Sequence, residues 1–146
     1  HHLVSAAFAR SILQEKGWSP EDISAVEHCI RAHRFRDRRE EPRSLEARVL
    51  YDADKLDAIG AVGVIRAFAY AITRGEVVYG APSQKFIETG ERETGEPHTP
   101  HHEFLYKLRH IKNRLYTGTG KELAGERHRF LVEFFDQFLA EQEGRR

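Results

Sequence analysis

Residues 50–60 read Leu50-Tyr51-Asp52-Ala53-Asp54-Lys55-Leu56-Asp57-Ala58-Ile59-Gly60, and this stretch carries more information than any other part of the chain. It holds three carboxylates within six residues, inside a run that is otherwise apolar and typical of a buried helix. Such a helix excludes unpaired acids, because a buried charge is costly unless a partner or a metal ion compensates it. The acidic cluster of Asp52, Asp54 and Asp57 therefore requires cations, and one of them could be a metal.

Spacing alone leaves two interpretations of this acidic cluster open. On a helix, Asp54 and Asp57 are three residues apart and share a face, whereas Asp52 lies on a different side. Nearby Arg48, Lys55 or Arg66 could neutralise the acids in structural ion pairs that hold helices together. The other interpretation is a metal site, but a divalent cation needs several ligands, so one helix cannot form the site alone.

Histidines are the natural additional ligands, and two groups of them are candidates. His28 and His33 are five residues apart on a predicted helix, about 140° around its axis, so both cannot point at one ion. One of them is expected to line a pocket while the other ends the helix, and simple packing or capping is the alternative for each. The histidines at positions 98, 101 and 102 cluster near a helix start, where solvated loop residues are the main interpretation and a zinc site is the alternative.

Basic residues could hold an anionic ligand. Lys107, His110 and Arg114 fall on one stripe of a predicted helix, and Lys112 lies on a neighbouring face. Arg66 lies further along the helix that carries the acids. Phosphate requires such cationic donors, and Arg can bind it bidentately. A solvated charged surface is the alternative interpretation.

Composition limits the classes of protein that fit. The chain has 146 residues, 40% apolar and 32% charged, which predicts one globular domain. It has 23 basic and 23 acidic residues, so a net charge of zero argues against binding extended nucleic acid. The single Cys29 fits a reducing cytoplasm, and the sequence shows no membrane span or signal peptide. Met is absent, so we expect upstream residues to be missing.

The hydrophobic periodicity predicts an all-α fold, a bundle of about five helices with one long loop. A Ser-Pro-Glu-Asp start at residues 19–22 is typical of a capped helix. Two glycines inside the third predicted helix, Gly60 and Gly63, are explained by close packing of another helix. The predicted helices cover residues 3–16, 20–33, 44–73, 101–116 and 119–142, and the loop over 75–100 is expected to be mobile, with a short helix at 83–89.

Several of these segments resemble a known family. Residues 28–33 read His-Cys-Ile-Arg-Ala-His, residues 44–63 contain the Asp-Ala-Asp-Lys-Leu-Asp run, and residues 66–70 read Arg-Ala-Phe-Ala-Tyr. Together with Glu-Arg-His-Arg-Phe-Leu-Val-Glu-Phe-Phe at residues 126–135, they resemble stand-alone bacterial HD-domain phosphohydrolases over essentially the whole chain. The resemblance implies an HD-like helical domain over residues 1–146.

The resemblance also implies a metal-dependent hydrolase of a nucleotide or related small phosphate compound. In the family a divalent ion (Mn, Mg, Co, Fe, Ni or Zn) is bound through a His, a His-Asp pair and a final Asp, and it activates water for attack on phosphorus. The final Asp corresponds to Asp54. The other candidates are catalytic or water-orienting groups (Asp57, His28 and His33) and phosphate contacts (Lys55, Arg66, Lys107 and Lys112).

One departure from the family pattern is clear. No His-Asp dipeptide occurs in the 146 residues, and the family's first His and its His-Asp pair belong upstream of the first predicted helix. His1 and His2 are either native or the remnant of a purification tag. The chain therefore corresponds to the C-terminal two-thirds of the usual domain, and we expect weak metal binding and apolar faces that pair with another chain, such as a second copy. The alternative function is a non-catalytic ligand-binding or assembly module with a degenerate metal site.

Overall fold

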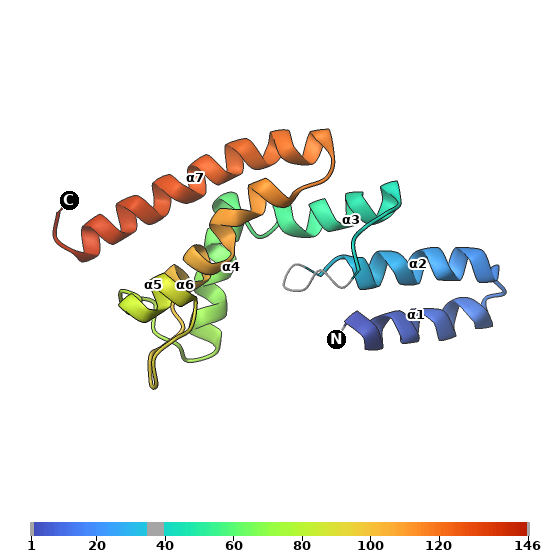
Figure 1. Ribbon diagram of the computed structural model, residues 1–146, viewed down its shortest axis with the longest axis horizontal. Coiled ribbons are helices and arrows are strands. Elements are labelled where there is room, and N and C mark those ends of the chain that lie inside the picture. Colours follow the sequence, from blue (N-terminus) through green and yellow to red (C-terminus); the bar gives the residue numbers. More distant parts are fainter. Residues whose placement is uncertain (1, 35–39, 146) are drawn as a thin grey trace. The chain divides into compact units, whose positions relative to one another are not determined.

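The computed structural model describes residues 2–34 and 40–145, and the regular secondary structure of these residues is helical throughout. Figure 1 shows the order of the elements along the chain. Seven α-helices and one 3-10 helix are present in the described part, with no strand, so the all-α prediction is confirmed and the number of helices exceeds the predicted five. Their bounds are α1 His2–Glu15, α2 Pro20–Ala32, α3 Leu45–Leu56, α4 Gly60–Thr73, α5 Gln84–Thr89, α6 Pro100–Tyr106, η1 Leu108–Arg114 and α7 Gly118–Gln142.

Helices α1 and α2 form a hairpin in which they pack side by side (Figure 1). The Ser19 side chain caps α2 by accepting a hydrogen bond from the backbone N–H of Asp22 (3.1 Å), and Pro20 begins the helix as predicted. Between the helices, Glu27 is buried and its carboxylate accepts a hydrogen bond from Nε of Arg10 (2.9 Å). The buried charge is therefore compensated by a bonded partner.

The predicted single helix over residues 44–73 is wrong, because the chain breaks between α3 and α4. Helix α3 ends at Leu56, and Ile59 is extended before α4 begins at Gly60. Gly60 has φ of +72°, a left-handed conformation that disfavours a side chain, and Cβ and Cγ of Arg127 lie 3.0 Å from where its own Cβ would be. Close packing of another helix thus explains Gly60 but not Gly63, whose Cβ would meet the carbonyl oxygen of Ala58.

The second half of the chain contains two confirmed helices, one of them the C-terminal helix predicted over residues 119–142 and present as α7, and one further break. The short helix expected at residues 83–89 is present as α5, capped by Ser83. The helix expected over 101–116 is instead α6 followed by the 3-10 helix η1, with Lys107 between them. The predicted stripe of Lys107, His110 and Arg114 on one α-helix is therefore wrong, because no single α-helix spans these positions.

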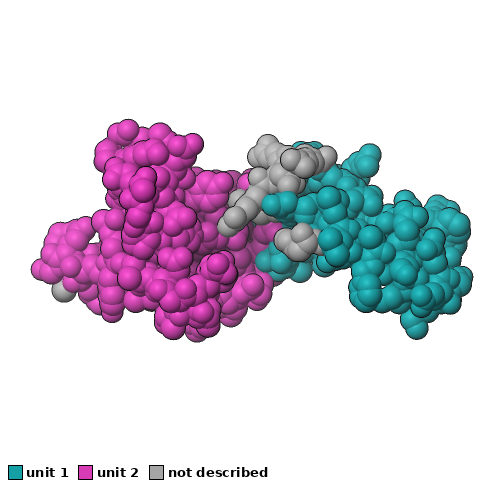
Figure 2. All heavy atoms as spheres, turned by 90° about the horizontal axis from the view of Figure 1, so that it is seen from below, with its two compact units in different colours: residues 1–54, 115–120 teal, residues 55–114, 121–146 magenta. Residues whose placement is uncertain are grey.

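Two compact units make up the chain and are coloured separately in Figure 2. The first comprises residues 1–54 and 115–120, and in it Tyr51 and Tyr116 meet edge to face with ring centroids 5.1 Å apart. The second comprises residues 55–114 and 121–146 and has an aromatic core around Phe135, which is fully buried and stacks on Phe104 at 4.3 Å. A single domain over residues 1–146 stays a prediction.

None of the described helices is by itself both long and apolar enough to cross a membrane, although the bent pair of α3 and α4 has sufficient length and apolar composition when taken together.

Candidate functional site

Asp52 is the buried member of the acidic cluster, and its partners come from the start of α7. Its carboxylate accepts hydrogen bonds from the backbone N–H groups of Tyr116 (2.9 Å) and Thr117 (2.7 Å) and from the Thr117 hydroxyl (2.6 Å). The Thr117 oxygen in turn accepts a hydrogen bond from the N–H of Gly120 (3.0 Å) inside α7. Asp52 therefore anchors the capped start of α7. Its role was missed from the sequence because nothing links residue 52 to a segment more than sixty positions away.

Asp54, the candidate metal ligand, lies near the end of α3 and is exposed. Leu50, four residues earlier on the same side of the helix, is 43% exposed. Val49 and Leu45 are 52% and 68% exposed, but they lie about 140° and 180° around the helix axis from Asp54. The accessible carboxylate of Asp54 therefore has one exposed apolar neighbour on its own face of α3, and further apolar side chains are exposed elsewhere on this helix.

Asp57 and Arg66 form an ion pair with each other in the second unit. Both side chains are more than half exposed, and Arg66 also donates to the backbone carbonyl of Asp57 (3.2 Å). Because Asp57 lies beyond the end of α3, it does not share a helix face with Asp54 as predicted. Lys55, expected to contact phosphate, is only 4% exposed. The structural interpretation of the cluster therefore holds for Asp52 and for Asp57.

His28 has both ring nitrogens engaged in the first unit. Its Nδ1 lies 2.7 Å from the carboxylate of Glu40, and its Nε2 accepts a hydrogen bond from the backbone N–H of Arg43 (3.1 Å). Since Nε2 accepts, the proton of the neutral ring lies on Nδ1 and is donated to Glu40. Arg31 also donates to Glu40, and this bond, with that from His28, lowers the pKa of Glu40 against the opposing effect of burial. His28 thus fastens residues 40–43 to α2.

His33 and the remaining lysines occupy separate places. His33 is the C-cap residue of α2, and its Nδ1 contacts the backbone carbonyl of Ile30, so the expectation that one of the two histidines ends the helix is confirmed. Lys107 forms an ion pair with Glu103 four residues earlier (2.9 Å). Lys112 is exposed, and its charge adds to the effect of burial in lowering the pKa of His128.

The histidines at 98, 101 and 102 do not gather around a common point. His102 is fully buried, with Nε2 2.8 Å from Glu96 and Nδ1 2.8 Å from the Thr99 hydroxyl. Over residues 2–34 and 40–145, no group of three or more His, Cys, Asp or Glu side chains could hold a metal ion, which contradicts the zinc alternative. Asp54 likewise belongs to no group of three or more such side chains in the described part of the chain. These residues alone therefore do not fit a bound metal ion.

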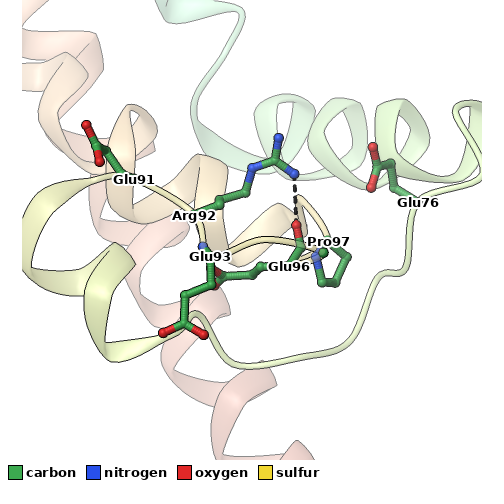
Figure 3. Close-up of a pocket in the computed structure, with 7 residues that line it drawn as sticks. Glu76, Glu91, Arg92, Glu93, Glu96 and Pro97 are labelled. Atoms are coloured by element: carbon green, nitrogen blue, oxygen red, sulfur yellow. Dashed lines mark hydrogen bonds between the residues drawn. The ribbon is translucent and has the colours of Figure 1, made fainter.

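An open hollow of about 760 Å³ lies in the second unit and is shown in Figure 3. Four glutamates contribute to its lining, and Arg92 crosses it to donate to the backbone carbonyl of Glu96 (3.0 Å). None of the site residues predicted from the sequence lines it. The lining residues are Glu76, Glu91, Arg92, Glu93, Gly95, Glu96 and Pro97.

Comparison with known proteins places the chain in a family. Residues 1–59, which include α1, α2, α3 and Asp54, match the family model described as HD domain. The chain is an HD-domain protein. The relationship suggested by the Asp-Ala-Asp-Lys-Leu-Asp run is confirmed, and its matched segment ends just before α4.

The HD-domain protein is related to YpgQ of Bacillus subtilis (strain 168), with 37% identity over 124 residues that cover 83% of this chain and 53% of YpgQ. The crystal structure of YpgQ in complex with ADP superimposes with a TM-score of 0.67 at 32% identity, covering 91% of this chain and 59% of that one. A crystal structure of an HD-superfamily hydrolase from Bacillus thuringiensis gives a TM-score of 0.61 at 28% identity, covering 91% and 60%. The chain thus spans about half the length of the curated relative it matches.

Proposed function

We propose that this HD-domain chain is part of a metal-dependent phosphohydrolase, which acts on a nucleotide or a related phosphate compound. The observation that carries the proposal is the HD-domain match over residues 1–59, which contains the one carboxylate that the family pattern assigns to the metal. The ADP complex of YpgQ supports a nucleotide as the substrate class, because that relative shares 32% identity over most of this chain.

The proposal assigns the metal ion to a larger donor set than the described residues supply. Asp54 is the only residue here that corresponds to a family ligand, and we place the remaining ligands outside residues 1–146. Two features support this arrangement: Asp54 is exposed, and α3 carries exposed apolar side chains (Leu45, Val49 and Leu50) on which other helices could pack. The metal, when bound by the full donor set, would supply an activated water for attack on phosphorus.

Arg66 is suited to bind phosphate because its present partner is weak. It is paired with Asp57, and both side chains are more than half exposed. Ion pairs at the surface contribute only about 0–1 kcal/mol, so an incoming phosphate could replace the carboxylate at small cost. Lys107 is a weaker candidate, because in its pair with Glu103 the two side chains are only 22% and 19% exposed. Lys112 is exposed and needs no such exchange. Lys55 is the weakest of the four candidates because it is buried.

The three candidate acid or base groups differ in how firmly their present contacts hold them. His28 is bonded at both ring nitrogens, so we assign it the positioning of residues 40–43 instead of proton transfer. His33 ends α2 and contacts its own helix, which also favours a structural role. Asp57 is exposed and could orient a water molecule or a ligand after Arg66 moves to phosphate. Among the three groups, Asp57 is therefore the strongest candidate.

A second candidate function is a non-catalytic ligand-binding or assembly module. The observation in its favour is the incomplete donor set among the described residues. The exposed apolar side chains of the first unit, among them Val4 and Phe8 at 73% and 68%, would then serve to bind a partner, and a second copy is one candidate. The two functions differ in whether the metal ligands exist anywhere in the natural protein.

The deciding experiment measures metal-dependent release of phosphate or pyrophosphate from a panel of nucleoside di- and triphosphates. It uses the full-length protein that carries this chain, its Asp54→Ala variant and, as a control, an Asp136→Ala variant that removes an exposed carboxylate of α7. Loss of a metal ligand is expected to lower the rate at least about 100-fold, while the control retains the wild-type rate.

Two results would count against the phosphohydrolase. Wild-type rates in Asp54→Ala would refute the assignment of the ligand while leaving the reaction in place. A full-length protein without metal-dependent hydrolysis of any nucleotide in the panel would refute the reaction itself and favour the binding module.

A further inference from the structure

Glu96 is the centre of a hydrogen-bond cluster that joins three parts of the second unit. Its carboxylate accepts hydrogen bonds from the backbone N–H (2.6 Å) and the hydroxyl (2.7 Å) of Ser83, which caps α5. It also accepts from the backbone N–H of Glu93 in the adjoining turn (2.6 Å) and lies 2.8 Å from Nε2 of His102 in α6. One side chain therefore ties together a helix start, a turn and a second helix.

His102 continues the cluster to the start of α6. Its Nδ1 accepts a hydrogen bond from the backbone N–H of Thr99 (3.2 Å), so the ring proton of the neutral imidazole lies on Nε2 and is donated to Glu96. The Thr99 hydroxyl, 2.8 Å from Nδ1, accepts from the backbone N–H of His102 (3.4 Å) and thereby completes the cap of α6. Each of the two side chains fixes the orientation of the other.

The Glu96 and His102 side chains are largely shielded from water, which strengthens the hydrogen bond between them. The His102 side chain is 1% exposed and that of Glu96 is 9% exposed, and the His102 ring meets the Phe86 ring edge to face at 4.5 Å. Burial raises the pKa of Glu96, but the hydrogen bonds from Ser83, His102 and Glu93 outweigh it and lower the pKa to about 2. Glu96 is therefore ionised at neutral pH and accepts these bonds as a carboxylate.

We propose that Glu96 and His102 clamp residues 83–102 into a rigid strap that is already formed before any ligand arrives. This segment holds α5, a glycine- and proline-containing turn and the start of α6, a composition typical of a mobile lid. The clamp instead connects Ser83 to Glu93, Glu96 and His102, so none of these four points moves without breaking a hydrogen bond to the Glu96 carboxylate. Because residues 91–93 and 95–97 line the hollow in Figure 3, this part of its wall keeps one shape.

Amide hydrogen exchange, followed residue by residue, tests the strap. In the wild-type chain, the amides of Ser83 and Glu93 donate to Glu96, whereas Thr94 and Gly95 are exposed residues of the same turn. We expect the first two to exchange at least tenfold more slowly, relative to their unstructured rates, than the last two. Equal protection across the four amides would show that the segment opens as a lid and would overturn the proposal.

A matched pair of variants identifies the side chain responsible. Glu96→Gln replaces one acceptor oxygen by an N–H₂ group. This group would face N–H or O–H donors from which it cannot accept a hydrogen bond. Exchange at Ser83, Glu93 and Thr99 should accelerate at least tenfold, with α1 and α2 unchanged. The control Glu93→Gln alters an exposed carboxylate of the same turn and should leave all three rates within about twofold. Unchanged rates in Glu96→Gln overturn the clamp, and the wild-type comparison decides the question if that variant does not fold.

Discussion

Asp52 and Asp54 lie two residues apart in α3 and have opposite surroundings. Two positions correspond to about 200° around a helix, so one carboxylate points into the first unit while the other is exposed. Asp52 is 3% exposed and satisfied by three donors from Tyr116 and Thr117. It is therefore a structural acid, whereas its neighbour Asp54 is exposed to solvent.

Replacing Asp52 by Asn should destabilise the protein without touching the proposed metal ligand. The Asn amide offers one acceptor oxygen, so at least one of the three donors, two of them backbone N–H groups, would face the new N–H₂ group. A buried donor left without an acceptor costs about 1–3 kcal/mol, and slightly more is expected here because a charged acceptor is lost. Urea denaturation followed by circular dichroism should show a loss of about 2–4 kcal/mol.

The control for Asp52→Asn is Asp136→Asn, which changes an exposed aspartate on α7 in the same chemical way. Surface substitutions of this kind usually alter stability by less than about 0.5 kcal/mol. Equal stability of the two variants would mean that Asp52 does not anchor the start of α7.

At the level of single residues, the sequence predicted the requirements of charged groups better than their partners. The rule that a buried acid needs a partner applies to Asp52, Glu27 and Glu96, each of which is bonded. The partner of Asp52 comes from more than sixty residues away, and a single sequence contains no signal for that distance. The histidines show the same limit: the C-cap position of His33 followed from its place in the helix, whereas the contact of His28 with Glu40 did not.

Among the elements, helix starts were predicted well and internal breaks were missed. The Ser-Pro start of α2 is a local capping signal that the structure confirms, and the short helix predicted over residues 83–89 is present, with Ser83 as its cap. The break between α3 and α4 left the apolar periodicity intact, so the pattern of residues 44–73 resembled one helix. Its physical cause is the left-handed Gly60, and a glycine in a sequence does not reveal which sign its φ takes.

Gly60→Ala is expected to destabilise the second unit because two costs coincide. A side chain at φ of +72° costs about 1–2 kcal/mol, and the new Cβ would lie 3.0 Å from Cβ of Arg127, which also donates to the backbone carbonyl of Leu56 (2.6 Å) at the end of α3. The midpoint of thermal unfolding, measured by circular dichroism, should fall by several degrees.

Gly125→Ala is the matched control for Gly60→Ala. Gly125 lies within α7, and a Cβ added there would meet nothing within 4 Å. This substitution should stabilise the helix by up to about 1 kcal/mol, because alanine has the higher helix propensity. A fall in the midpoint for Gly125→Ala, or none for Gly60→Ala, would contradict the account of the break.

At the scale of the whole molecule, composition and periodicity were sufficient for the all-α class, and the family relationship came from a few short motifs. Which of the candidate site residues could form a common site was not predictable from the sequence. The candidates lie in two compact units, and several of them are engaged in structural contacts. Several apolar side chains on α1 and α3 are more than half accessible, namely Val4, Phe8, Leu45 and Val49. They mark surface that a soluble helix usually covers.

The metal affinity of the 146-residue chain should differ sharply from that of the full-length protein. Asp54 is one matched ligand, and no complete group of donors exists over the described residues, so the chain alone should bind Mn²⁺ at least about 100-fold more weakly in a calorimetric titration. Asp54→Ala should weaken binding to the full-length protein at least tenfold and change that of the 146-residue chain less than twofold. Tight binding to the shorter chain that is lost in Asp54→Ala would instead place a complete site within these residues, because one carboxylate cannot hold the ion alone.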